Sequence, residues 1–357
     1  MLIVILCSLS SWYIIWDSIL IFVDYSMYME FSSVIEIVLT LLLIIGVGYA
    51  ARRYNILSKD SVSSISKFVL FVSLPALILV SSTSQPFTPD SVNIIFLLLF
   101  SSAVYYMVSI VAALIIPRLI HSKPKEIGIY RFILVFPSAI FFAFPIIDMI
   151  FDQEGILYAA IFNLPYFLLT FSLGIWLMTS SLKKEATSAK FDPRIFLNLA
   201  FLATLAGLLL YFTYTPIPEP FRGTLSLLGK MSTPLALIAT GGFLFEVNIL
   251  ALFKNSRHYL IAVARLVVLP LIVFVILDTA LPLFDFEVLH VELLSEAKNM
   301  ILAIAVIIAA MPAAVQTVII AAEYKAYPEI AAEVILVTTL LATVTIPLLF
   351  IIGLIPC

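Results

Sequence analysis

Two apolar stretches decide the fold: RFILVFPSAIFFAFPIIDMI (131–150) and MPAAVQTVIIAAEY (311–324). Each places a proline inside a segment that otherwise predicts a helix in a membrane. Proline removes a main-chain hydrogen bond and leaves a carbonyl without its donor. In lipid such a carbonyl is tolerated only where protein or water can satisfy it. Pro137 and Pro312 therefore predict two helices that are broken inside the protein.

The composition of the chain predicts a membrane protein. Of its 357 residues, 63% are hydrophobic and 11% are charged, and the mean hydropathy is +1.18. A soluble domain of this length needs more charge to cover its surface. Apolar stretches long enough to cross about 30 Å of hydrocarbon recur along the chain. The ten predicted spans are 32–53, 62–82, 92–117, 128–150, 155–181, 194–214, 222–246, 258–281, 296–322 and 329–354.

The N-terminal extension, residues 1–31, is also apolar. Its first 23 residues are interrupted by a single charge at Asp17, and no basic residue occurs before Arg52. A secretory signal peptide normally has a basic n-region, so this segment does not read as one. Two interpretations stay open: an extra helix that spans or lies on the membrane, and a start codon assigned too far upstream.

The positive charges predict how the chain is oriented. Fourteen of the 19 Lys and Arg residues fall in alternate loops, and the opposite loops contain Arg222 alone. Because cytoplasmic loops are enriched in Lys and Arg, the basic loops are expected in the cytoplasm. We therefore expect a multi-pass protein of the plasma or inner membrane. The core N-terminus and the C-terminus lie outside, and the central loop 182–193 is cytoplasmic.

The central loop divides the ten spans into two sets of five, residues 32–181 and 194–357. An odd number of helices per set forces the second set to enter the membrane inverted, as in inverted-repeat transporters. Local matches support the division, because Gly48 precedes Pro75 by 27 residues and Gly207 precedes Pro234 by the same 27. The expected fold is all-α, with two inverted five-helix repeats.

Polar residues beside the predicted breaks are candidates for substrate binding. The free N-terminal ends of half-helices carry partial positive charge, which suits an anion. Ser138 follows Pro137 directly, Gln316 lies four residues after Pro312, and Asn163 lies in the fifth span. Polar side chains at this depth are costly, so they are functional candidates by default.

Two charged residues and the rarer side chains complete the candidates. Asp148 reads either as a solvated helix end or as a proton or cation site. Arg265, in the eighth span, could hold an anionic substrate, but pairing with a carboxylate is the favoured interpretation. The two cysteines and three histidines lie far apart, so the sequence predicts no metal site and no cofactor.

Three regions resemble the auxin efflux carrier family, which includes the plant PIN proteins and malate-permease-like prokaryotic members. They are GYAARRYNILSKDSVSSISKFVLFVSLPAL (48–77), the paired Pro137 and Pro145 followed by FDQEG (151–155), and MPAAVQTVIIAAEYKAYPEIAAEVILVTTLLATVTIPLLF (311–350). The resemblance covers about residues 32–354, in the same order.

The resemblance implies a ten-helix core of the bile-acid-symporter and sodium–proton-antiporter type. In that core, spans four and nine cross as broken helices at the substrate site, and the crossover prolines map onto Pro137 and Pro312. Family members commonly have Asn directly after the first proline and four residues after the second. Here these positions are Ser138 and Gln316, which keep hydrogen-bonding capacity.

The sequence thus predicts an alternating-access carrier of small organic anions, such as carboxylates or auxin-like acids. The alternative is a symporter or antiporter of the same fold, coupled to H⁺ or Na⁺. An intramembrane enzyme is disfavoured, because the chain has no HExxH or GxSxG motif and no histidine at mid-membrane. The expected partners are the substrate, the bilayer and a coupling cation, with no nucleic acid, and a homodimer stays open.

Overall fold

The structure is a computed structural model that describes residues 39–40, 42–84, 91–180, 199–213, 215–245, 255–284, 291–314 and 316–354. The predicted N-terminal extension 1–31 and the central loop 182–193 lie outside these residues. Residues 42–53 are helical. The elements that follow are α2 (Lys59–Phe68), η1 (Val69–Ser73), α3 (Leu74–Ser84), α4 (Ser91–Leu119), α5 (Pro124–Val135), η2 (Ala139–Ala143), α6 (Phe144–Phe162), α7 (Leu164–Leu169), η3 (Thr170–Gly174), α8 (Ile175–Thr179), α9 (Leu199–Thr213), α10 (Glu219–Lys230), α11 (Ser232–Phe245), α12 (Ser256–Val263), η6 (Ala264–Val268), α13 (Leu269–Ala280), η7 (Leu281–Leu283), α14 (Val291–Ala309), α15 (Gln316–Glu323) and α16 (Pro328–Ile351).

Helical structure occurs in every predicted span, and the described residues form no β-sheet. Five spans are long, continuous and apolar enough to cross a membrane; they are Lys59–Ser84, Ser91–Leu119, Glu219–Phe245, Ser256–Leu283 and Pro328–Phe350. The fourth, fifth and ninth spans are divided into shorter helices. The all-helical membrane architecture expected from the sequence is therefore present.

Prolines accompany the irregular turns and the breaks within the spans. The π-helical turns η1, η2 and η6 lead directly into helices whose second residues are Pro75, Pro145 and Pro270. Proline cannot donate to the carbonyl one turn earlier, and a wider π turn accommodates the missing bond. Pro137 and Pro312 instead lie in fully non-helical segments.

The fourth and fifth spans are joined by a sharp turn inside α6. Asp152 has φ 50° and ψ −145°, which divides α6 into two helical parts. The fifth span is divided again at Asn163, which ends α6 and begins α7. Because α8 packs against α5, the chain returns alongside the fourth span after the turn.

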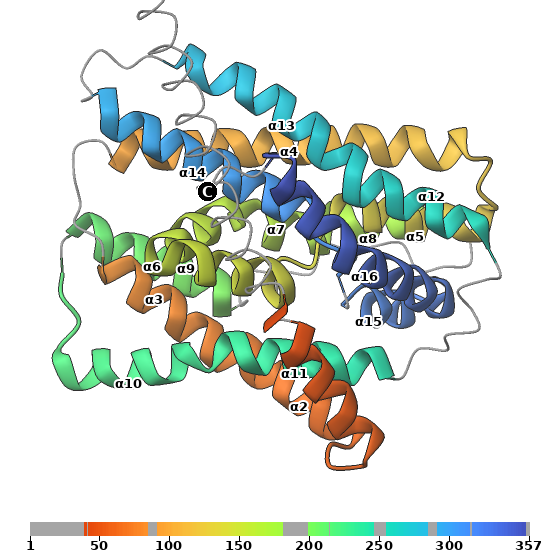
Figure 1. The fold of residues 1–357 in the computed structure, drawn as a ribbon, viewed down its shortest axis with the longest axis horizontal. Helices are drawn as coiled ribbons and strands as arrows, with labels where there is room; N and C mark the ends of the chain where they lie inside the picture. Colours follow the sequence, from red (N-terminus) through yellow and green to blue (C-terminus); the bar gives the residue numbers. More distant parts are fainter. Residues whose placement is uncertain are drawn as a thin grey trace, which may run out of the picture.

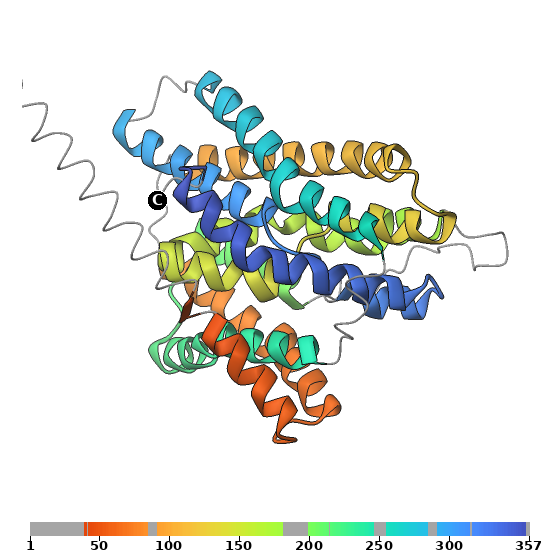
Figure 2. The same cartoon turned by 45° about the vertical axis from the view of Figure 1, so that its right-hand side comes forward.

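The helices form two groups (Figures 1 and 2). Helices α2, α3, α9, α10 and α11 pack against one another, and α4, α5, α8 and α12–α16 form the second group. Helix α6 contacts α3 and α11 of the first group and α4 and α14 of the second. It therefore lies between the groups.

The most deeply buried segments are the helices that precede the two breaks. Every residue from Ala303 to Met311 has an exposed fraction of 0%, and so does every residue from Phe132 to Phe136. A helix that is apolar all round is expected in the protein interior. Both breaks are thus surrounded by protein rather than by lipid.

Two glycines allow close approach of helix backbones in the first group. A Cβ atom added at Gly48 would lie 2.2 Å from the carbonyl oxygen of Ile238 in α11, and one at Gly207 would lie 2.3 Å from Oγ of Ser82 in α3. Small residues at such crossings are how membrane helices pack without a hydrophobic driving force.

We predict that Gly48→Ala destabilises the protein, because the added methyl group clashes with a main-chain carbonyl that cannot move alone. The expected loss is about 1–3 kcal/mol, typical of overpacking, and is measured as a lower apparent Tm in detergent. Gly46→Ala is the matched control, since a Cβ at Gly46 meets no atom within 4 Å. Equal melting temperatures for both variants would contradict the prediction.

Candidate functional site

The candidate site is built from the two interruptions in the fourth and ninth spans. Helix α5 ends at Val135, and helical structure resumes at Ala139. Helix α14 ends at Ala309, and α15 begins at Gln316. Each span thus consists of two half-helices joined by a short extended segment that contains a proline.

The two extended segments cross and bond to each other through the main chain. Pro137 pairs with Ala313 in an isolated antiparallel bridge. The N–H of Ser138 donates to the carbonyl of Pro312 at 2.8 Å. In an unbroken helix this N–H would bond to Leu134, four residues earlier. The two breaks therefore satisfy part of each other's main-chain hydrogen-bonding groups. We call the two segments, one between α5 and η2 and the other between α14 and α15, the crossing.

Arg265 satisfies carbonyls that the crossing leaves without helical donors. Its side chain is 0% exposed. Nη1 donates to the carbonyl of Leu134 at 2.9 Å, and Nε donates to the carbonyl of Met311 at 3.2 Å. These carbonyls lie at the C-terminal ends of the first half-helices, where the helix dipole is negative. The guanidinium therefore neutralises both negative ends at once.

Tyr105 completes this arrangement. Its hydroxyl accepts a hydrogen bond from Nη1 of Arg265 at 3.1 Å and donates to the carbonyl of Val135 at 3.0 Å. The sequence favoured a carboxylate as the partner of Arg265. In the described residues its partners are two carbonyls and a phenol, because the broken helices supply the negative charge themselves.

Thr338 of α16 holds the second break from the other side. Its hydroxyl accepts from the N–H of Ala313 at 3.1 Å and donates to the carbonyl of Ile335 at 3.0 Å. The main chain of the crossing is therefore held by Arg265 on its carbonyl side and by Thr338 on its N–H side.

Gln316 and Asn163 come together through Tyr166. The Nε2 group of Gln316, at the start of α15, donates to the hydroxyl of Tyr166. Tyr166 lies in α7, and its N–H donates to the carbonyl of Asn163 at 3.0 Å. The ring of Tyr166 also packs edge-on against Phe136, with centroids 5.9 Å apart. Gln316 and Asn163 thus belong to the surroundings of the crossing.

Several buried polar atoms around the crossing lack hydrogen-bond partners within the described part of the chain. They are Oγ of Ser138, Oδ1 of Asn163, Oγ1 of Thr317 and Nη2 of Arg265. Buried polar atoms are nearly always satisfied in folded proteins, by protein, water or ligand. Those on residues next to the breaks are therefore candidates for contact with a polar ligand.

Asp148 lies apart from the crossing. Its carboxylate accepts a hydrogen bond from the hydroxyl of Thr233 at 2.9 Å, and both side chains are half-buried. This contact links α6 to α11, and so links the region of the crossing to the first group of helices.

The family of the chain agrees with this geometry. A family model described as membrane transport protein matches residues 33–196 and 192–350, which together cover most of the chain. The chain belongs to the membrane transport protein family. No curated protein sequence shows a significant match to it.

Membership of this family confirms the resemblance to auxin efflux carriers that the motifs indicate. A membrane transport protein acts on a substrate and spans a bilayer, and the apolar helices fit a multi-pass membrane protein. It is a family of transporters rather than of enzymes. Among the described residues, no three His, Cys, Asp or Glu side chains are grouped as metal ligands.

Four residues of this membrane transport protein were missed from the sequence: Tyr105, Tyr166, Thr317 and Thr338. Each is a polar side chain inside a predicted span, which is a usable signal. Hydroxyl groups are common in membrane helices, however, because they can bond to their own backbone, as Thr204 and Thr240 do. Only the folded arrangement separates these cases.

We predict that Arg265→Lys destabilises the protein, because an ammonium group cannot reach both half-helix ends with the geometry of a guanidinium. The expected loss is about 2–3 kcal/mol, the scale of a hydrogen bond to a charged group. The measurement is the apparent Tm of the purified protein, with Arg222→Lys on an exposed face of α10 as the matched control. If both variants melt at the wild-type temperature, Arg265 does not hold the crossing.

Proposed function

We propose that the protein is a secondary transporter of small organic anions and that the anion binds at the crossing. The observation that carries the proposal is the direct main-chain contact between the two broken spans, at Ser138 and Pro312. This contact brings the N-terminal ends of two second half-helices to one place. Those ends present N–H groups and partial positive charge, which favour an anion.

The unpaired polar atoms suit a carboxylate ligand. The hydroxyls of Ser138 and Thr317 can donate to carboxylate oxygens, and so can Nη2 of Arg265. Oδ1 of Asn163 can only accept, so it suits a donor group on the same ligand, such as a hydroxyl or ring N–H. Gln316 is tied to Tyr166 through its amide nitrogen, and its amide oxygen is a further acceptor for such a donor.

The proposed architecture is two inverted five-helix repeats, 32–181 and 194–357. Two glycine contacts support this architecture, because each is the counterpart of the other when the first and second repeats are interchanged. Gly48 of the first span packs on the seventh span at Ile238, and Gly207 of the sixth span packs on the second span at Ser82. The two matched segments of the family model, which meet near residue 194, support the same division.

The two groups of helices support alternating access. In this proposal the first group, with α2, α3, α9, α10 and α11, keeps its position in the bilayer. The crossing belongs to the second group of helices, which moves past the first group. The bound anion then faces one side of the membrane and afterwards the other. We keep the orientation indicated by the basic loops, with the N-terminal ends of α5, α12 and α16 in the cytoplasm.

A second candidate is a cation-coupled symporter or antiporter of the same fold. The observation that favours it is the hydrogen bond between Asp148 and Thr233, which joins α6 to α11. A carboxylate at the boundary between a fixed and a moving group can link protonation to movement.

We predict that purified protein in liposomes takes up malate or indole-3-acetate in a saturable manner. Gln316→Ala is expected to lower the initial rate about ten-fold, which corresponds to the loss of about 1.4 kcal/mol of interaction. Ser138→Ala is expected to act in the same direction.

Gln153→Ala is the matched control for the transport assay. Gln153 lies next to the turn at Asp152, away from the crossing, so uptake should stay at the wild-type rate. Saturable uptake that Gln316→Ala and Ser138→Ala leave unchanged would place the binding site elsewhere. No uptake of either acid, under any imposed potential or pH gradient, would contradict the organic-anion proposal.

We predict for the cation-coupled candidate that Asp148→Asn abolishes the response of uptake to an imposed pH gradient. Thr233→Val, which removes only the hydrogen-bond donor, should preserve the response but change its pH range. A carrier whose uptake responds to the gradient equally in wild type and Asp148→Asn does not use Asp148 for coupling.

A further inference from the structure

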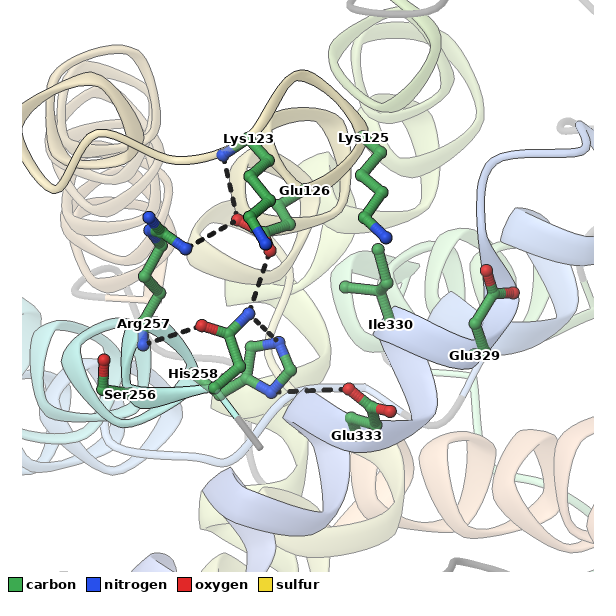
Figure 3. A pocket seen from close by; sticks show the side chains of 10 residues that line it. Lys123, Lys125, Glu126, Ser256, Arg257, His258, Glu329, Ile330 and Glu333 are labelled. Carbon is green, nitrogen blue, oxygen red and sulfur yellow. Dashed lines mark hydrogen bonds and ion pairs between the residues drawn. The ribbon is translucent and has the colours of Figure 1, made fainter. Parts of the chain in front are cut away.

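A polar cavity of about 350 Å³ lies where three helices begin (Figure 3). It is lined by residues at the N-terminal ends of α5, α12 and α16, which are far apart in the sequence. The partial positive charges of three helix dipoles therefore converge on it. This cavity lies at the opposite ends of α5 and α12 from the crossing.

Glu126 of α5 is the carboxylate at the centre of this cluster, and it is 2% exposed. One oxygen accepts from the N–H of Lys123 at 2.9 Å and lies 3.9 Å from Nη1 of Arg257. The other accepts from the amide nitrogen of Asn255 at 2.9 Å. Glu126 thus offsets the positive helix ends and ties α5 to the start of α12.

Asn255 has its side-chain amide committed at both ends. Its oxygen accepts from the N–H of Arg257 at 3.2 Å, which caps α12. Its nitrogen donates to Glu126 and lies 3.2 Å from Nε2 of His258. The amide therefore cannot rotate without losing both the helix cap and the link to α5.

His258 is consequently restricted to one neutral form. It is 1% exposed, and its Nε2 must accept from the Asn255 amide nitrogen. The single ring proton is then on Nδ1, which faces a carboxylate oxygen of Glu333 in α16 at 3.7 Å. Addition of a second proton, on Nε2, would place an N–H group against the amide nitrogen of Asn255, which is itself a donor, so this hydrogen bond would be lost. The positively charged ring would be attracted to the carboxylate of Glu333.

The three helices tied together here are the ones that hold the crossing. Helix α5 ends at the first break. Seven residues after His258, the continuation of α12 carries Arg265, and five residues after Glu333, α16 carries Thr338. The same three elements thus run from the cavity to the crossing.

We propose that His258 is a cytosolic pH switch: its protonation releases the Asn255–Glu126 link between α5 and α12 and strengthens the pairing of α12 with α16. The charged and titratable groups that face the ring come from all three helices. Glu126 and Tyr130 face it from α5, with the Tyr130 ring edge-on at a centroid distance of 5.9 Å. Arg257 lies on α12 and Glu333 on α16; the other charged residues of the cavity are Lys123, Lys125 and Glu329.

The test is hydrogen exchange of the full-length protein in detergent micelles, with no substrate present. Between about pH 7.5 and about pH 4.5, a range that extends well below the usual histidine pKa of about 6.5 because the ring is buried, protection factors in residues 124–131 should fall about ten-fold. This is the factor expected when a hydrogen bond to a charged group is lost. His258→Gln, which keeps an acceptor but cannot be protonated, should show no such fall.

His121→Gln is the matched control, because His121 is exposed on the preceding turn and should leave the response intact. Glu333→Gln is a second variant that keeps the shape of the cluster. It should move the midpoint of the fall about one pH unit lower, because a neutral side chain no longer favours the charged ring. A fall of equal size in His258→Gln, or no fall in wild type down to about pH 4.5, overturns the proposal.

The consequence for transport rests on the proposed function, but the exchange test does not. In liposomes, the uptake rate of wild type should depend on pH at the face that carries the cavity, and His258→Gln should remove that dependence. If no organic anion is transported while the exchange response is present, the proposed substrate fails and the switch stands. If uptake occurs with the same pH dependence in wild type and His258→Gln, the switch plays no part in transport.

Discussion

The main-chain carbonyls of two interrupted helices need hydrogen-bond donors in a place where water is scarce, and the structure is organised around that need. Proline removes donors from both spans, so the freed carbonyl and N–H groups must be satisfied by other parts of the protein. The crossing meets part of the demand through Ser138 and Pro312. Arg265 and Thr338 satisfy further groups from the eighth and tenth spans, and Tyr105 does so from the third.

A buried arginine is usually read as a ligand for a substrate or a carboxylate. Here its guanidinium faces the negative ends of two half-helices, so its first role is to let those ends come together. The N-terminal ends of the second half-helices, which begin at Ala139 and Gln316, carry partial positive charge instead. The same breaks that cost main-chain hydrogen bonds thereby create a positive environment suited to an anion.

The polar cluster around Glu126 and His258 applies the same physics at the other ends of the helices. Three positive helix ends converge there, and carboxylates balance them. Helices α5, α12 and α16 run from this cluster toward the crossing. In the proposed carrier, that arrangement would let the chemistry of one membrane face influence a site buried at mid-membrane.

Hydropathy alone determined the helical membrane class and predicted where helices form, because the length of an apolar segment is a local property. Pro137 and Pro312 likewise predicted two interruptions that the structure contains, since the lack of an N–H is also local. Which groups satisfy those interruptions depended on the tertiary structure. Arg265 lies some 130 residues from Leu134 in the chain, and no pattern within either segment encodes their contact. The convergence of Glu126, Asn255, His258 and Glu333 has the same origin, because only helix packing brings three distant helix ends together.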